Sequence, residues 1–179
     1  MASLNRPGGN ATGVHVLTID LESKRLELLS EMVPASAPVA VLINLHSEHA
    51  EQQAKDVQAG GSRIGRRILI LNASSARDID TAFRTLIERR AAGLLVTADA
   101  FFNSRREQLV ALAAYHAIPA IYEWREYALA GGLMTYGSSI TDAYRQAGIY
   151  IGRILKGEKP SDLPVVQPTK FELNRADVG

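Results

Sequence analysis

The sequence predicts an α/β fold in which a parallel sheet carries helices on both faces. Short apolar runs rich in branched residues recur roughly every 25 residues, as expected of strands that alternate with helices. Segments with helical spacing of apolar residues lie between these runs, and a helix is the usual crossover between parallel strands. The chain has 179 residues, of which 46% are hydrophobic, which is enough for one domain with a real core.

The chain opens with turn residues and a predicted first helix. Residues 3–13 are rich in Gly, Pro and Asn, and residues 14–17 fit a short strand or a crossover. The helix is expected to begin at Thr18 or Asp20 and to reach Met32. Its buried face is expected to carry four apolar residues, namely Leu21, Leu28, Leu29 and Met32.

A strand, a helix and a second strand are predicted next. Val39–Ile43 is a continuous apolar run, typical of a strand that is buried on both faces. A weaker helix follows up to Ala59, where the pair Gly60-Gly61 is expected to end it. Residues 68–71 form the next apolar run and therefore the second predicted strand.

A capping pair predicts the start of the third helix. Ser75 and Asp78 have the spacing at which a small acceptor and a carboxylate satisfy the first amide groups of a helix. The apolar residues that follow have helical spacing and are expected to form the buried face: Ile79, Ala82, Phe83, Leu86 and Ile87.

The same alternation continues towards the end of the chain. Further strands are predicted at Gly93–Val96, 118–122, 133–135 and 170–173. Ser104 with Glu107, and Ser139 with Asp142, are capping pairs that predict two more helices. Residues 124–130 fit a short helix between two of these strands.

Polar and aromatic residues follow several predicted strands. Ligands of open α/β sheets bind outside the carboxyl ends of the strands. The expected ligand-binding residues are Asn44, Asp99, Phe101, Glu123, Trp124 and Tyr136. Several of them have a structural alternative: Asp99 fits a cap of the next turn, one of Phe101 and Phe102 fits the core, and Glu123 and Trp124 fit a solvated turn with the indole packed inward.

Composition and missing motifs exclude several classes of protein. A formal net charge of +1 gives no basic excess that would indicate nucleic-acid binding, and the absence of cysteine excludes disulfides. The dinucleotide fingerprint and the phosphate-binding loop are absent, and no nucleophile–base pair is present, so an enzyme has little support. His46 and His49 are interpreted as solvated turn residues, so no metal and no cofactor is expected.

The sequence shows no membrane-crossing or export segment. No apolar run approaches the roughly 20 residues that span a bilayer. Residues 1–20 lack the charged start and apolar stretch of a signal peptide.

Several segments together resemble the ABC-transporter substrate-binding protein family that is typified by tryptophan- and tyrosine-type importers. In chain order these segments are SLNRPGGNATG (3–13), KRLELL (24–29), VAVLIN (39–44), ADAFFNSRREQ (98–108), IPAIY (118–122), GGLMTYG (131–137), YRQAG (144–148), LP (163–164) and QPTKF (167–171). The resemblance covers nearly the whole chain and is specific as a set.

The resemblance implies one lobe of a two-lobed, type I-like periplasmic binding protein. Ligand, such as an amino acid, would bind between the lobes, and closure would signal to an ABC permease and its ATPase. The implied organisation is a hinge segment at 1–19, an α/β ligand-binding lobe at 20–157 and a crossover tail at 158–179. The location implied is periplasmic, although a chain without a signal peptide leaves a cytoplasmic location open.

Two departures from the family pattern affect the expected function. Met1 stands just before the 3–13 motif and residues 174–179 leave the pattern, so the chain is expected to be a second lobe with its hinge segments. A lobe alone is expected to bind ligand weakly and to form a homodimer through exposed apolar surface. Two alternatives stay open: a sensor or interaction module in which a partner chain replaces the first lobe, and a small α/β enzyme.

Overall fold

The computed structural model describes residues 8–15, 21–167 and 171–175. Five sequence predictions fall partly outside these residues. They are the first part of the 3–13 motif, the end of the strand or crossover at 14–17, the start of the first helix at Thr18 or Asp20, the middle of the 167–171 motif, and the first residue of the strand at 170–173.

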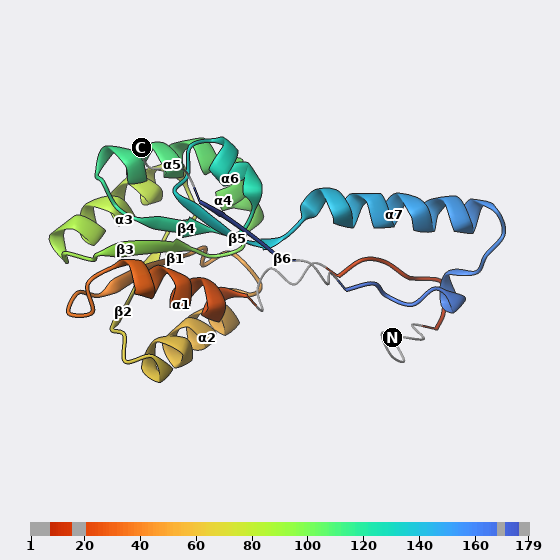
Figure 1. The fold of residues 1–179 in the computed structure, drawn as a ribbon, viewed down its shortest axis with the longest axis horizontal. Helices are drawn as coiled ribbons and strands as arrows, with labels where there is room; N and C mark the ends of the chain where they lie inside the picture. Colours follow the sequence, from red (N-terminus) through yellow and green to blue (C-terminus); the bar gives the residue numbers. More distant parts are fainter. Residues whose placement is uncertain (1–7, 16–20, 168–170, 176–179) are drawn as a thin grey trace. The chain divides into compact units, whose positions relative to one another are not determined.

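A six-stranded sheet forms the centre of the fold, with the strand order β2-β1-β3-β4-β5-β6 (Figure 1). Its strands are β1 Val39–Ile43, β2 Ile68–Asn72, β3 Gly93–Val96, β4 Ala120–Tyr122, β5 Met134–Ser138 and β6 Phe171–Arg175. The pairs β1–β2, β1–β3, β3–β4 and β4–β5 are parallel, which confirms the predicted fold class.

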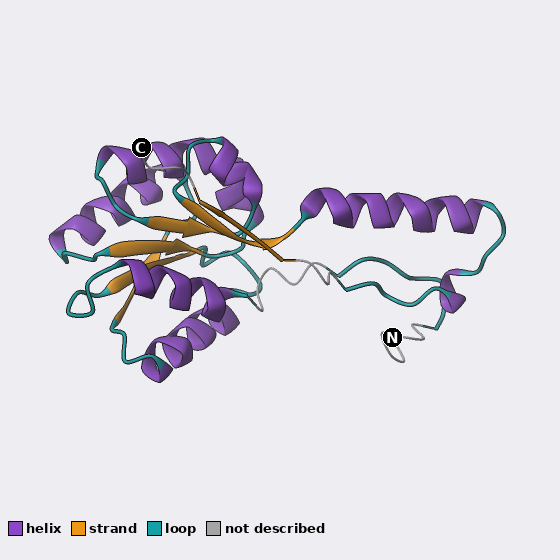
Figure 2. Cartoon of the chain, in the orientation of Figure 1, coloured by secondary structure: helices purple, strands orange, loops and turns teal. Residues whose placement is uncertain are grey.

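Helices cover both faces of the sheet (Figure 2). The covering helices are α1 Glu22–Met32, α2 Ala50–Arg63, α3 Ala76–Glu88, α4 Ala100–Ser104, α5 Arg106–Tyr115 and α6 Arg125–Leu129. Later in the chain come α7 Ile140–Leu155 and a short 3-10 helix at Pro160–Asp162. Side chains of β1 alternate between the faces. Ala40 and Leu42 pack with α3 and α5, whereas Val39, Val41 and Ile43 pack with α1 and α2.

The described residues fall into two compact units. One contains residues 21–137 and 173–175, and therefore most of the sheet. The other contains residues 8–15, 138–167 and 171–172, in which the Tyr150 hydroxyl donates to Pro164 O at 2.6 Å and Val14 forms a parallel bridge with Val166. The predicted division at residues 19 and 157 stays a prediction.

The first helix buries a different face from the one predicted. Met32 is 40% exposed and Leu21 and Leu28 are only half-buried, whereas the buried positions of α1 are Glu22, Arg25, Leu26 and Leu29. The reason is that the two charged side chains find hydrogen-bond partners inside the fold, which offsets the cost of burying them.

Gly60 and Gly61 lie inside α2 and do not end it. A Cβ atom on Gly61 would lie 2.4 Å from Ile68 Cγ1, and one on Gly60 would lie 3.2 Å from Ser23 Oγ. These glycines therefore permit the close packing of α2 against its neighbours. The helix ends at Arg63, and Gly65 with φ 67° provides the left-handed turn.

Two of the three predicted capping pairs are confirmed. The Ser75 and Ser139 side chains accept from the backbone N–H groups of Asp78 and Asp142. The prediction that Ser104 and Glu107 cap a helix is wrong. Ser104 is the last residue of α4, and α5 begins after Arg105 without a side-chain cap. The cap of α4 is Asp99, whose side chain accepts from Phe101 N.

Three further predictions needed correction. Ile87, which was expected on the buried face of α3, is 42% exposed. The fourth strand begins after Pro119, since proline has no N–H to donate to a sheet. The fifth strand extends to Ser138, so Tyr136 lies within a strand and not after one.

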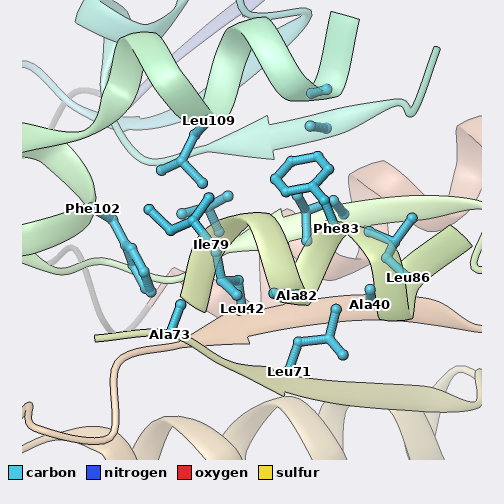
Figure 3. Close-up of a cluster of buried hydrophobic side chains, with 14 of the residues drawn as sticks. Ala40, Leu42, Leu71, Ala73, Ile79, Ala82, Phe83, Leu86, Phe102 and Leu109 are labelled. Carbon is cyan, nitrogen blue, oxygen red and sulfur yellow. The ribbon is translucent and has the colours of Figure 1, made fainter. Parts of the chain in front are cut away.

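Ile79 of α3 is fully buried in the hydrophobic cluster that α3 and α5 form with the sheet. Figure 3 shows Ile79 between Leu42 of β1 and Leu109 of α5, with Phe102 beside them. We expect Ile79→Ala to lower the free energy of unfolding by about 2–5 kcal/mol, because it leaves a cavity in a closed core.

Urea denaturation followed by circular dichroism measures this loss. The matched control is Ile87→Ala, the same substitution at an exposed position of the same helix, which should cost less than about 1 kcal/mol. Equal losses for the two variants would show that the core does not depend on this cluster.

Candidate functional site

The carboxyl ends of β1, β3 and β4 meet at one edge of the sheet because these strands are parallel and adjacent. Leu42 of β1 pairs with Val96 of β3, so the residues that follow the two strands lie side by side. Asn44 follows β1 and Asp99 follows β3 by three residues. We call this the carboxyl edge.

Asn44 and Asp99 are joined by a hydrogen bond. The Asn44 side-chain amide donates to Asp99 Oδ1 at 3.0 Å, and the same oxygen accepts from Phe101 N at 2.8 Å. Asn44 Oδ1 accepts from His46 N at 3.0 Å. The second oxygen of Asp99, Oδ2, makes no hydrogen bond with the described residues, so it is the oxygen that a ligand donor can use.

The two phenylalanines after β3 have different roles. Phe102 is fully buried in the core, whereas Phe101 is half-buried at the margin of the same cluster. Their ring centroids are 5.5 Å apart. Phe101 is therefore the one of the two that presents an aromatic surface near Asp99.

Glu123 directly follows β4 at the carboxyl edge and interacts with the charge of Arg25. Its side chain is 3% exposed, and burial raises the pKa of Glu123 to about 8 although the Arg25 charge opposes this shift. Arg25 is itself buried, and its Nε donates to Tyr136 O at 2.7 Å. Arg25 thus connects α1 to the end of β4 and to β5.

The strand β5 approaches the end of β4 very closely. A Cβ atom on Gly137 would lie 2.0 Å from Glu123 O, so no other residue fits there without moving the backbone. Tyr136 beside it is half-buried and packs against the hydrophobic cluster under α1 and α2.

Trp124 begins α6 and is half-buried. Its indole Nε1 is buried and has no hydrogen-bond partner in the described part of the chain. Five of the six predicted residues form two groups: Asn44, Asp99 and Phe101 are linked directly, and Glu123 and Tyr136 lie around Arg25. Trp124 belongs to neither group.

Sequence reasoning missed a buried polar network beside the carboxyl edge. Glu22 Oε1 accepts from Gln53 Nε2 at 2.9 Å and from Ala98 N at 3.1 Å. Gln53 Nε2 also donates to Ala98 O at 2.9 Å, and both side chains are fully buried. The available signal was the helical spacing of Glu22 and Arg25 with Leu26 and Leu29, but charged residues at such positions usually mark a solvated face.

A hollow of about 470 Å³ lies away from these groups, beside the start of β4. It is lined by Val110, Ala113, Ala114, Ala117, Ile118, Ala120, Tyr122, Gly131, Gly132 and Leu133. Because no charged side chain lines it, it does not have the polar groups of the carboxyl edge.

A family model described as "ABC transporter substrate binding protein" matches residues 1–175. The chain belongs to this family. The search of curated proteins gave no match. Among the described residues, none of the helices combines the length and the apolar character needed to cross a membrane.

Several solved structures have a similar fold. A conserved domain protein from Vibrio cholerae superposes with a TM-score of 0.82 at 21% identity, with 97% of this chain and 57% of that chain covered. An ABC domain from Streptococcus pneumonia in complex with L-Trp has a TM-score of 0.74 at 21% identity, with 97% and 59% covered.

A probable maltose operon transcriptional repressor from Staphylococcus aureus has a TM-score of 0.60 at 13% identity, with 89% and 58% covered. At these identities the likeness shows the fold alone. The chain spans less than three fifths of the length of the three solved proteins.

Burial of Glu123 predicts a pH-dependent stability. Because the folded-state pKa, about 8, lies above the ordinary value of 4.5, the folded protein holds this proton more tightly than the unfolded chain. The contribution of Glu123 to the free energy of unfolding is therefore fully present below about pH 4.5 and is lost as the pH rises towards 8.

We expect Glu123→Gln to flatten this loss by an amount on the order of a few kcal/mol. Urea denaturation at pH 5 and pH 8 measures it, and Glu88→Gln, at an exposed position, is the control. A pH profile that is the same in Glu123→Gln and the wild type would contradict the prediction.

Proposed function

We propose that the chain is a non-enzymatic solute-binding component of an ABC importer, in which the carboxyl edge forms one wall of the ligand site. The family match over residues 1–175 carries this proposal. The second wall would come from another lobe, so that ligand is enclosed in a cleft between the two. The implied partners are a permease and its ATPase, and the implied location is outside the cytoplasmic membrane.

The proposed ligand is amino-acid-like. Asp99 Oδ2 offers a carboxylate oxygen to a ligand ammonium group, and Phe101 lies next to it as an aromatic surface. The backbone N–H groups at the start of a helix favour a ligand carboxylate. The structural neighbour that holds L-Trp supports the same ligand class only weakly, since its likeness to this chain is one of fold.

Transcriptional repressors share this fold, so a sensor that pairs with another protein is the second candidate function. The family match favours transport over this alternative. Retention of a small solute without a protein partner supports transport, whereas stable association with another protein and no solute supports the sensor.

Calorimetric titration with the L-amino acids tests the ligand class. We expect one or more to bind with a dissociation constant weaker than about 1 μM, because a single wall encloses ligand incompletely. Binding of a monomer below that value would contradict the single-wall site, and a folded protein that binds none would contradict the amino-acid ligand.

Asp99→Asn tests the charge of the site with little structural change. Asparagine is as good a helix cap as aspartate, so the amide keeps the turn but removes the negative charge. We expect affinity for the bound amino acid to fall by about 10-fold or more, as for a lost charge-assisted hydrogen bond. Asp80→Asn, an exposed residue of α3, is the matched control and should bind as the wild type does.

The homodimer expected from the sequence stays a proposal. Apolar side chains on α7 are largely exposed, among them Tyr144 at 72%, Ile151 at 59% and Leu155 at 83%. Native mass spectrometry of the purified protein measures the oligomeric state and any retained ligand together. A monomer at micromolar concentration would contradict the proposed dimer.

A further inference from the structure

The Glu22–Gln53 pair has two buried oxygen atoms left over. Glu22 Oε1 and Gln53 Nε2 are already hydrogen-bonded to one another at 2.9 Å. Glu22 Oε2 and Gln53 Oε1 are both buried and have no partner among the described residues. Two acceptor oxygens cannot bond to each other unless one of them carries a proton, and buried polar atoms without partners are costly.

We propose that Glu22 and Gln53 form a proton-dependent clamp on the Ala98 peptide, which positions Asp99 and Phe101 for ligand. In the protonated state, Glu22 Oε2–H donates to Gln53 Oε1, while Gln53 Nε2 donates back to Glu22 Oε1. Both leftover oxygens then have partners. The clamp rests on the proposed function only in its second step, the effect on ligand.

The clamp holds the Ala98 peptide through both of its polar atoms. Ala98 N donates to Glu22 Oε1 at 3.1 Å, and Ala98 O accepts from Gln53 Nε2 at 2.9 Å. Asp99 is the next residue, and its Oδ1 in turn holds the Asn44 amide and the Phe101 N–H. Glu22 and Gln53 are therefore positioning residues that act through the backbone and do not touch ligand themselves.

The surroundings of Glu22 favour the proton near neutral pH. The pKa of Glu22 is raised to about 7, mainly by burial and to a smaller extent by Asp56 on α2, against the lowering effects of the Ala98 N–H, Arg25 on α1 and Gln53. Glu123 at the end of β4 is the other carboxyl group that interacts with Glu22. Above pH 7 ionisation strengthens the bond from Ala98 N–H to Glu22 Oε1, but it removes the bond from Glu22 Oε2–H to Gln53 Oε1 and leaves a buried charged oxygen without a donor. The Glu22–Gln53 pair is then held by one bond instead of two, so the clamp loosens as the pH rises.

A ligand-free experiment tests the clamp first. The Ala98 amide proton is a reporter because it donates directly to Glu22 Oε1. We expect its NMR resonance to titrate between pH 5 and pH 9 and this titration to vanish in Glu22→Gln. Glu51→Gln, the same substitution at a residue whose side chain is 82% exposed on α2, should leave the titration unchanged. An Ala98 amide that does not titrate, or one that still titrates in Glu22→Gln, overturns the clamp.

A binding experiment tests its effect on the site, with L-tryptophan as the probe. If only the clamped state binds, affinity should fall about 10-fold between pH 6 and pH 8, in proportion to the protonated fraction. Glu22→Gln should bind at both pH values as the wild type does at pH 6, because a glutamine amide donates to Gln53 Oε1 without a titrating proton. Glu51→Gln should keep the wild-type pH dependence.

Gln53→Leu removes the other half of the clamp and should weaken binding at both pH values. Gln52→Leu, at the exposed neighbouring position, is its control. A Glu22→Gln variant that loses affinity between pH 6 and pH 8 as the wild type does overturns the positioning role. If L-tryptophan binds no variant while the Ala98 titration behaves as expected, the clamp stands and the amino-acid ligand of the proposed function fails.

Discussion

Burial of the sheet on both faces is the constraint on which the rest of this structure depends. With helices packed over each face, polar side chains can function only where strands end, and any that lie deeper must find partners inside the protein. Asn44 and Asp99 meet the first condition, since they follow neighbouring strands and are joined to each other. Glu22, Arg25 and Gln53 meet the second, and their hydrogen bonds connect the helices of one face to the carboxyl edge.

The strands and the sheet could be predicted because their signal is local. Val39–Ile43 and Gly93–Val96 are unbroken apolar runs, and only a strand buried on both faces accommodates such a run at that length. The cap at Ser75 is equally local, since acceptor and donor are three residues apart. The order of the strands in the sheet is not local, and the chain alone gives no register for β6.

The errors arose where packing partners decide the outcome. The exposed Ile87 and the buried Glu22 both lie on well-formed helices, but the rotation of each helix against the sheet is set by contacts far away in the sequence. Gly60 and Gly61 looked like a helix end because glycine often is one, whereas here the reason for glycine is the closeness of Ile68. Asn44 and Asp99 were predictable from strand ends, but the network at Ala98 was not, because it joins residues from three elements.

The chain contains one tryptophan, Trp124, and it lies half-buried at the start of α6, directly after Glu123. Its indole N–H is buried and has no protein partner among the described residues, so a movement that opens this site to water or to a bound solute would change the surroundings of the indole. Indole emission is sensitive to such contacts. The protein therefore carries an intrinsic fluorescent probe next to its candidate binding wall. Because Trp124 is the single tryptophan, a shift in its emission wavelength would report on the surroundings of that residue alone.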